Sequence, residues 1–143
     1  AEHATRFGPD GRPGIIQGYK SIFLQDEDGQ VLPTHSISAG LDYAGIGPEA
    51  AFLHDAGRVR FVSVTDEEAL GAFRRLCAEE GILPALESAH AAAHALKVAA
   101  RYPKDAVMVG NISGRGEKDL FITARALDKE NWLDFLRREA RDE

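Results

Sequence analysis

The feature that most constrains this chain is an apolar run at 106–109 that leads into a turn rich in glycine. The β-branched residues of the run favour a strand at 106–111, and the residues at about 118–127 favour a helix. Ligands of open α/β sheets bind where strands end. Ser113 adds a hydroxyl there, and the glycines allow a close backbone approach. The segment therefore predicts either a ligand site or an ordinary structural turn capped by Ser113.

Composition limits the protein classes to consider. The chain has 143 residues, which suits one domain or part of one, and 44% of them are hydrophobic. The net charge of −6, without a dominant basic block, argues against nucleic-acid binding. The single cysteine fits a reducing compartment, and no apolar stretch approaches the length of a membrane span. We therefore expect a cytoplasmic protein that contacts neither nucleic acid nor membrane.

Short strands and turns dominate the first part of the sequence. Residues 15–16 and 22–25 are typical of strands, and the Asp28-Gly29 pair is typical of a hairpin turn. A short helix is expected at 49–55, closed by Gly57, before a strand at 60–64.

Helices dominate the second part of the sequence. Thr65 and Glu68 form a capping-box pattern for a helix that runs to about Glu80. A second, alanine-rich helix is expected at 86–101. The order strand, helix, helix, strand, helix indicates an α/β fold. Residues 128–143 form a separate predicted helix, whose apolar face is expected to contact the body or a partner.

Two further groups of polar residues are candidates for a site. Glu87, His90 and His94 share one helical face, but helical metal sites of this kind need a second such motif, which the chain lacks. The carboxylate of Glu87 is either solvated at the helix start or directed into a pocket. The small, polar loop at 36–43 either lines a site or lies at the surface. Cys77 lies on an apolar helix face and is expected to be an inert core residue.

Four segments, in this order and spacing, resemble the C-terminal third of tryptophan synthase β chains. They are Gly14 with 25–30; 35–43 with 47–49; 62–70 with 81–91; and 111–119. The resemblance covers about residues 2–127. It implies part of the C-terminal three-layer domain of a fold-type-II enzyme dependent on pyridoxal phosphate (PLP). It also divides the chain into that domain segment at 1–127 and an additional C-terminal helix at 128–143.

The resemblance implies that L-serine and indole are joined into L-tryptophan, and it suggests residues for the cofactor. Ser113 and Gly114 would bind the cofactor, and Ser113 would hydrogen-bond the pyridine nitrogen and leave it neutral. Glu87 would lie beside the ring near its phenolic oxygen.

The resemblance assigns the remaining site roles to one loop. Gly40 would pack against the cofactor ring, and Asp42 would bind the serine hydroxyl. The backbone carbonyls of Tyr43 and Gly45 would bind a monovalent cation, Na⁺ or K⁺.

The family's cofactor lysine and phosphate loop have no counterpart in this sequence. No His-Lys-x-Asn motif is present, so this chain alone is expected to be inactive. The resemblance therefore implies three polypeptide partners, namely an N-terminal β-chain part that carries the lysine, a second β chain and an α subunit, together with the two substrates. The alternative hypothesis is a non-catalytic, truncated relative that binds a partner or a ligand.

Overall fold

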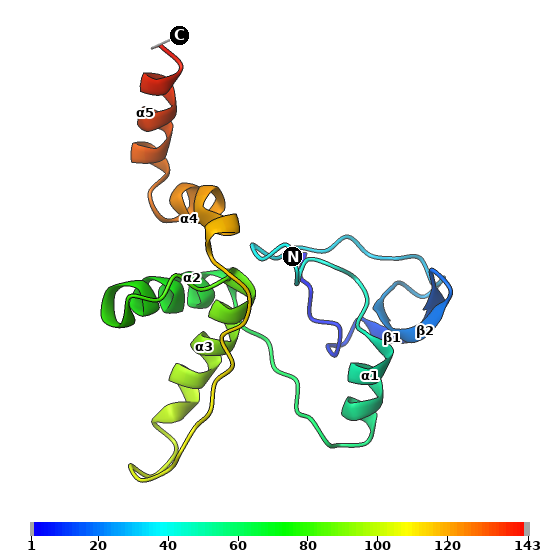
Figure 1. Ribbon diagram of the computed structural model, residues 1–143. Coiled ribbons are helices and arrows are strands. Elements are labelled where there is room, and N and C mark those ends of the chain that lie inside the picture. The colour runs from blue at the N-terminus through cyan, green and yellow to red at the C-terminus, as the bar shows by residue number, and fades with distance from the viewer. Residues whose placement is uncertain (1, 142–143) are drawn as a thin grey trace. The chain divides into compact units, whose positions relative to one another are not determined.

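The computed structural model describes residues 2–141, which form two compact units (Figure 1). Of these residues, the first unit covers 2–63 and the second covers 64–141. This division reflects how the chain packs. Whether 128–143 is an addition to the family domain stays a prediction.

A β-hairpin forms the centre of the first unit. Strand β1 (Gly11–Ile16) pairs antiparallel with β2 (Tyr19–Leu24), with Gly11 opposite Leu24. Gln17 and Gly18 both have positive φ, 53° and 84°, as the tight two-residue turn of a twisted hairpin requires. The predicted strands at 15–16 and 22–25 lie within or next to this hairpin. The full length of β1 was not predicted, because Pro13 and the glycines of β1 are unfavourable in strands.

A third backbone segment and one helix complete this unit. The N–H of Leu24 donates to the carbonyl of Ala44 at 2.8 Å, and the N–H of Ile46 donates to the carbonyl of Ile22 at 3.1 Å. The predicted turn at 28–29 is confirmed by the positive φ of Gly29, 80°. Helix α1 (Pro48–Asp55) also forms as predicted and is followed by Gly57 at φ 64°. Phe23 and Leu24, each 1% exposed, are the most deeply buried apolar side chains of this unit.

Two packed helices form the body of the second unit. Helix α2 (Asp66–Arg75) begins at the predicted capping box, with both reciprocal Thr65–Glu68 bonds present. It continues into a π-helical turn, η1 (Leu76–Glu80), which ends at Gly81. Helix α3 (Leu86–Ala99) packs on α2. The buried residues between them are mostly small: Ala69, Ala72, Phe73, Leu86 and Ala89. Cys77 is half-buried, and this burial raises the pKa of its thiol, which disfavours the reactive thiolate.

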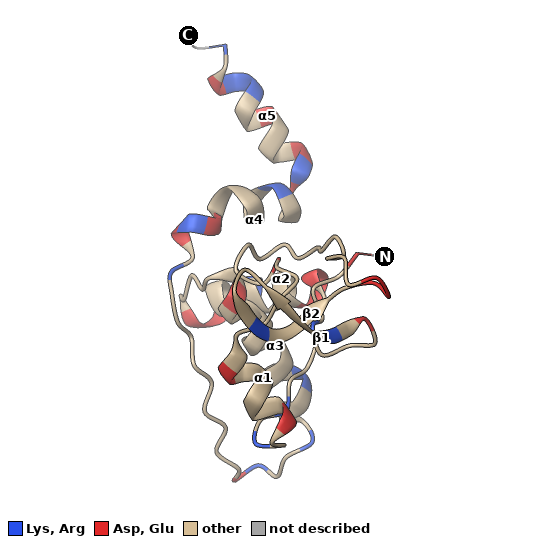
Figure 2. Cartoon of the chain, turned by 90° about the vertical axis from the view of Figure 1, so that its right-hand side faces the viewer, with Lys and Arg blue, Asp and Glu red and all other residues tan. Residues whose placement is uncertain are grey.

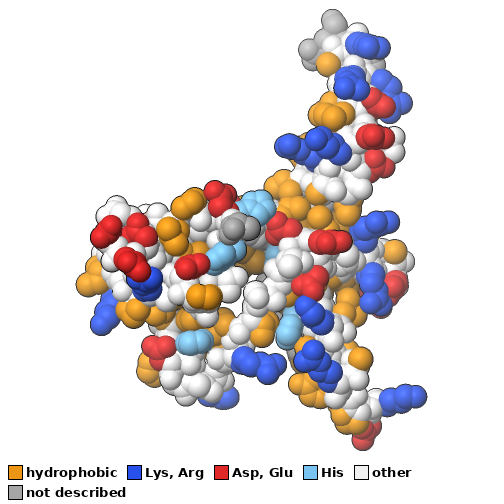
Figure 3. All heavy atoms as spheres, turned by 180° about the vertical axis from the view of Figure 1, so that it is seen from behind, with side chains coloured by type: hydrophobic (Ala, Val, Ile, Leu, Met, Phe, Trp, Pro, Cys, Tyr) orange, Lys and Arg blue, Asp and Glu red, His pale blue; other side chains and the backbone are white. Residues whose placement is uncertain are grey.

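The last part of the second unit is helical. The 3₁₀ turn η2 (Glu117–Asp119) leads into α4 (Leu120–Leu127), and α5 (Lys129–Glu139) follows. The ring of Trp132 on α5 contacts Phe121 on α4 at a centroid distance of 5.5 Å. Charges of both signs lie along α5 (Figure 2). Apolar side chains remain at the surface where α4 meets α5 (Figure 3), with Phe121 the most exposed of them.

Two predicted strands are wrong. Residues 60–64 and 106–111 have no regular secondary structure, and neither segment is in a sheet. A strand of a parallel sheet is stable only between neighbours that pair with its backbone and cover its faces. In this structure Val107 and Val109 are 89% and 90% exposed. The mixture of helices and strands agrees with the predicted class, whereas the three-layer domain stays a prediction.

No helix among residues 2–141 is long and apolar enough to cross a lipid bilayer.

Candidate functional site

The turn at Ser113 is fixed to the first turn of α3. The hydroxyl of Ser88 donates to the carbonyl of Ser113 at 2.7 Å and accepts from the N–H of Ser113 at 3.1 Å. Ser88 is only 4% exposed, so this anchor is protected from water. Ser113 and Gly114 themselves are exposed. The backbone is therefore held in place while the Ser113 residue remains accessible to a ligand.

Two glycines of this turn have different structural roles. Gly114 has a φ of 75°, a conformation that favours glycine. Gly116 is buried, and a Cβ at this position would lie 2.5 Å from the carbonyl oxygen of Pro84. Gly116 therefore allows the turn to approach the chain's own backbone before α3, whereas a close approach of the turn to a ligand stays a prediction.

Asp119 joins the turn to the start of α3. Its side chain is 3% exposed, and its Oδ2 accepts the N–H of Leu86 at 2.9 Å. The first N–H groups of a helix have no partner within the helix, and a carboxylate there is also favoured by the helix dipole. Asp119 therefore acts as an N-terminal cap that comes from 33 residues further along the chain.

Lys118 connects Asp119 with Glu87. Its Nζ lies 2.8 Å from Asp119 Oδ2 and 2.9 Å from Glu87 Oε2. The pKa of Lys118 is raised above its ordinary value, chiefly by the hydrogen bond to Asp119 and further by that to Glu87, while desolvation opposes the shift. Glu87 is neither free in solvent nor alone in a pocket, the two alternatives left open by its sequence. It belongs to a cluster of one cation and two carboxylates beside the Ser113 turn.

This cluster predicts a change in stability at high pH. Because the pKa of Lys118 is raised on folding, its contribution is fully present below the ordinary value of 10.5 and is lost as the pH rises through the folded pKa. We expect the melting temperature to fall more steeply above pH 10.5 for the parent than for Lys118→Met. Parallel melting curves of the two proteins across this range would contradict the prediction.

His90 on α3 contacts the backbone of its own helix. His90 Nδ1 lies 2.7 Å from the carbonyl of Leu86, one helical turn earlier, and its side chain is 11% exposed. Among residues 2–141, no group of three or more His, Cys, Asp and Glu side chains is arranged to hold a metal ion.

The loop at 36–43, in the first unit, is built around Ser38. The carbonyl of Ser38 accepts the N–H groups of Leu41 and Asp42, both at 3.0 Å. Gly40 and Asp42 are exposed, whereas Ser38 is fully buried. The Ser38 hydroxyl has no hydrogen-bond partner among the described residues. The loop therefore exposes Gly40 and Asp42 to solvent, while the Ser38 hydroxyl is buried without a hydrogen bond within the described part of the chain.

Tyr43 and Gly45, the predicted cation ligands, lie where this loop returns to β2. The carbonyl of Tyr43 accepts a hydrogen bond from Arg6 Nη1 at 3.1 Å. Gly45 packs face-on against the hairpin, because a Cβ there would lie 2.6 Å from Cε1 of Phe23.

Comparison with known proteins decides the family. The sequence profile of the family described as pyridoxal-phosphate dependent enzymes matches residues 9–114. The chain belongs to this family.

Several members of the family are similar over most of this chain. The tryptophan synthase β chain of Jannaschia sp. (strain CCS1) is 59% identical over 117 residues, which are 82% of this chain and 29% of the relative. That of Ruegeria sp. (strain TM1040) is 58% identical over 82% of this chain and 28% of the relative. The β chain of Helicobacter hepaticus is 58% identical over 88% of this chain and 30% of the relative. This chain therefore spans less than a third of the length of these relatives.

Each unit of this pyridoxal-phosphate family chain carries one group of the predicted site residues. Ser113, Gly114 and Glu87 belong to the second unit, and Gly40, Asp42, Tyr43 and Gly45 belong to the first. The supporting residues were missed. Ser88, Lys118 and Asp119 lie inside the segments that resemble the family, so they were present in the motif without an assigned role. Nothing in the sequence around Arg6 indicated its contact with Tyr43.

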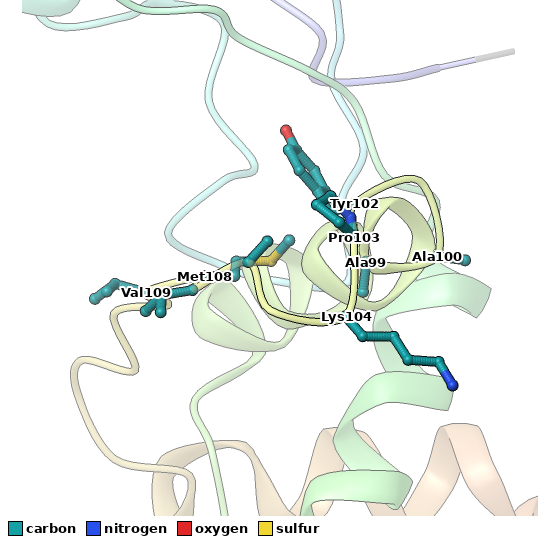
Figure 4. Close-up of a pocket in the computed structure, with 9 residues that line it drawn as sticks. Ala99, Ala100, Tyr102, Pro103, Lys104, Met108 and Val109 are labelled. Carbon is teal, nitrogen blue, oxygen red and sulfur yellow. The ribbon is translucent and has the colours of Figure 1, made fainter.

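A hollow of about 650 Å³ lies at the end of α3 (Figure 4). Its lining comes from the end of α3 and from the extended segment that follows, including Tyr102, Lys104 and Met108. None of the predicted site residues lines it. It lies beside the apolar segment that forms no strand, so we assign no ligand to it.

Proposed function

We propose that this chain is the C-terminal part of a tryptophan synthase β enzyme, which joins L-serine and indole into L-tryptophan by replacement at Cβ. The observation that carries the proposal is the Ser113 turn, held by Ser88 next to Glu87 at the start of α3. Identity of 55–59% to tryptophan synthase β chains supports it.

The residues present suit one end of a PLP ring. Ser113 is exposed on a fixed backbone, and its uncharged hydroxyl can donate to the pyridine nitrogen. A hydroxyl leaves that nitrogen neutral, in contrast to a carboxylate, which would favour its protonation. When bound, the cofactor would supply the electron sink that makes bond changes at Cα and Cβ of serine possible. The positive φ of Gly114 sets the direction of the backbone immediately after Ser113.

The two carboxylates serve different steps in this proposal. The Glu87 carboxylate lies 2.9 Å from Lys118 Nζ, which fixes its position, so it can accept a hydrogen bond near the phenolic oxygen of the ring. Asp42 is exposed on its loop, where its carboxylate can bind the serine hydroxyl. Gly40, without a side chain, leaves room for a flat ring.

The proposal includes the partners that the full reaction requires. They are the β-chain part with the cofactor lysine, a second β chain and an α subunit. A monovalent cation on the carbonyls of Tyr43 and Gly45 belongs to the same proposal, because neutral oxygens suit a hard ion.

Reconstitution with the missing part tests this function. The chain would be combined with the N-terminal segment of the Jannaschia relative, and tryptophan formation from serine and indole would be measured. We expect Ser113→Ala to lower kcat/KM by about tenfold, the effect of losing one hydrogen bond to the neutral ring nitrogen. Ser63→Ala, at an exposed position outside the site, is the matched control.

The same experiment addresses the alternative hypothesis. Equal activity of the parent and Ser113→Ala would remove the assigned role of Ser113. A chain that never associates with the lysine-bearing segment would favour a non-catalytic module.

A further inference from the structure

Arg6 contacts the loop at 36–43 through two backbone oxygens. Its Nη1 donates to the carbonyl of Leu41 at 2.6 Å and to the carbonyl of Tyr43 at 3.1 Å. The guanidinium comes from a segment 35 to 37 residues earlier in the chain. It therefore makes a non-local link between the N-terminal segment and the loop that presents Gly40 and Asp42.

The loop conformation needs such support. The fully buried Ser38 hydroxyl has no partner among the described residues, and an unsatisfied buried hydroxyl disfavours the conformation that buries it. Within the loop, the carbonyl of Ser38 already accepts two N–H groups. The carbonyl of Leu41 accepts the N–H of Tyr43 at 2.9 Å as well as Arg6 Nη1, and the carbonyl of Tyr43 accepts Arg6 Nη1. A charged donor forms stronger hydrogen bonds than a neutral one.

The charge of Arg6 persists in this setting. Burial lowers the pKa of Arg6 from its ordinary value, but a guanidinium remains protonated in proteins. A fixed positive charge beside neutral carbonyl oxygens has the same electrostatic role as a bound ion.

We propose that Arg6 is a positioning residue, a built-in cation that holds the 36–43 loop in the shape that presents Gly40 and Asp42. The purpose of this positioning rests on the proposed function, whereas the clamp itself does not.

Hydrogen exchange of single amides, followed by NMR on the full chain, tests the clamp. In Arg6→Met, which keeps the apolar stem and removes the donors, the amides of Leu41 and Asp42 are expected to lose about tenfold of their protection. The amides of Leu24 and Ile46, which pair the same segment with the hairpin, should keep theirs. Arg12→Met is the matched control, because Arg12 is exposed on β1.

Chemical rescue distinguishes a clamp from a merely structural side chain. In Arg6→Gly, millimolar guanidinium should restore protection of Leu41 and Asp42, and choline at equal ionic strength should not. Three results would each overturn the proposal: unchanged exchange in Arg6→Met, equal loss at Leu24, or equal rescue by choline. None of these measurements involves tryptophan formation, so the clamp and the proposed function can fail separately.

Discussion

Replacing Asp119 by alanine is expected to lower the free energy of unfolding by about 2–4 kcal/mol, a large share of the stability of a small domain. The substitution leaves the N–H of Leu86 without its acceptor, and Leu86 is 0% exposed. It also removes the partner that most raises the pKa of Lys118. Both losses fall at the start of α3, so the helix and the Ser113 turn should be destabilised together.

Urea denaturation followed by circular dichroism measures this effect. Asp119→Asn keeps an acceptor oxygen but loses the charge, and it should lose less stability than Asp119→Ala. Glu117→Ala removes an exposed carboxylate two residues away and should stay within about 0.5 kcal/mol of the parent. An Asp119→Ala protein as stable as the Glu117→Ala control would show that the cap does not contribute.

Helices and turns were predictable because their signals are local. The Thr65 capping box, the stop at Gly81 and the turn at Gly29 each depend on a few consecutive residues. The strands at 60–64 and 106–111 were not predictable in the same way. A strand forms only when a neighbouring strand pairs with it. An apolar, β-branched run favours strand conformation but does not determine whether such a neighbour is present.

The same difference between local and non-local signals applies to the candidate site. The residue types at Ser113 and Glu87 were visible in the sequence, but their anchors were not. Asp119 caps a helix 33 residues earlier, and Arg6 contacts carbonyls 35 and 37 residues later. Such contacts join segments whose proximity depends on the whole fold. The family resemblance located the segments, and only the structure gave the reason for these side chains.

Gly116→Ala is expected to lower the free energy of unfolding by about 1–3 kcal/mol, because a new Cβ would overlap backbone that cannot easily move. That Cβ would lie 2.5 Å from the carbonyl oxygen of Pro84 and 2.6 Å from that of Leu83. These carbonyls immediately precede α3, whose start is bonded to Asp119. Relief of the overlap must therefore displace either the Ser113 turn or the beginning of α3.

The chain offers a control of opposite sign for the same chemical change. Gly71 lies exposed within α2, and a Cβ there would meet no atom within 4 Å. Gly71→Ala should therefore raise stability by about 0.5–1 kcal/mol, since alanine favours a helix and restricts the unfolded chain. Urea denaturation of the two variants should move the midpoint in opposite directions. If Gly116→Ala were as stable as Gly71→Ala, the turn would not be held against 83–84, and the fixed position of Ser113 would lose its support.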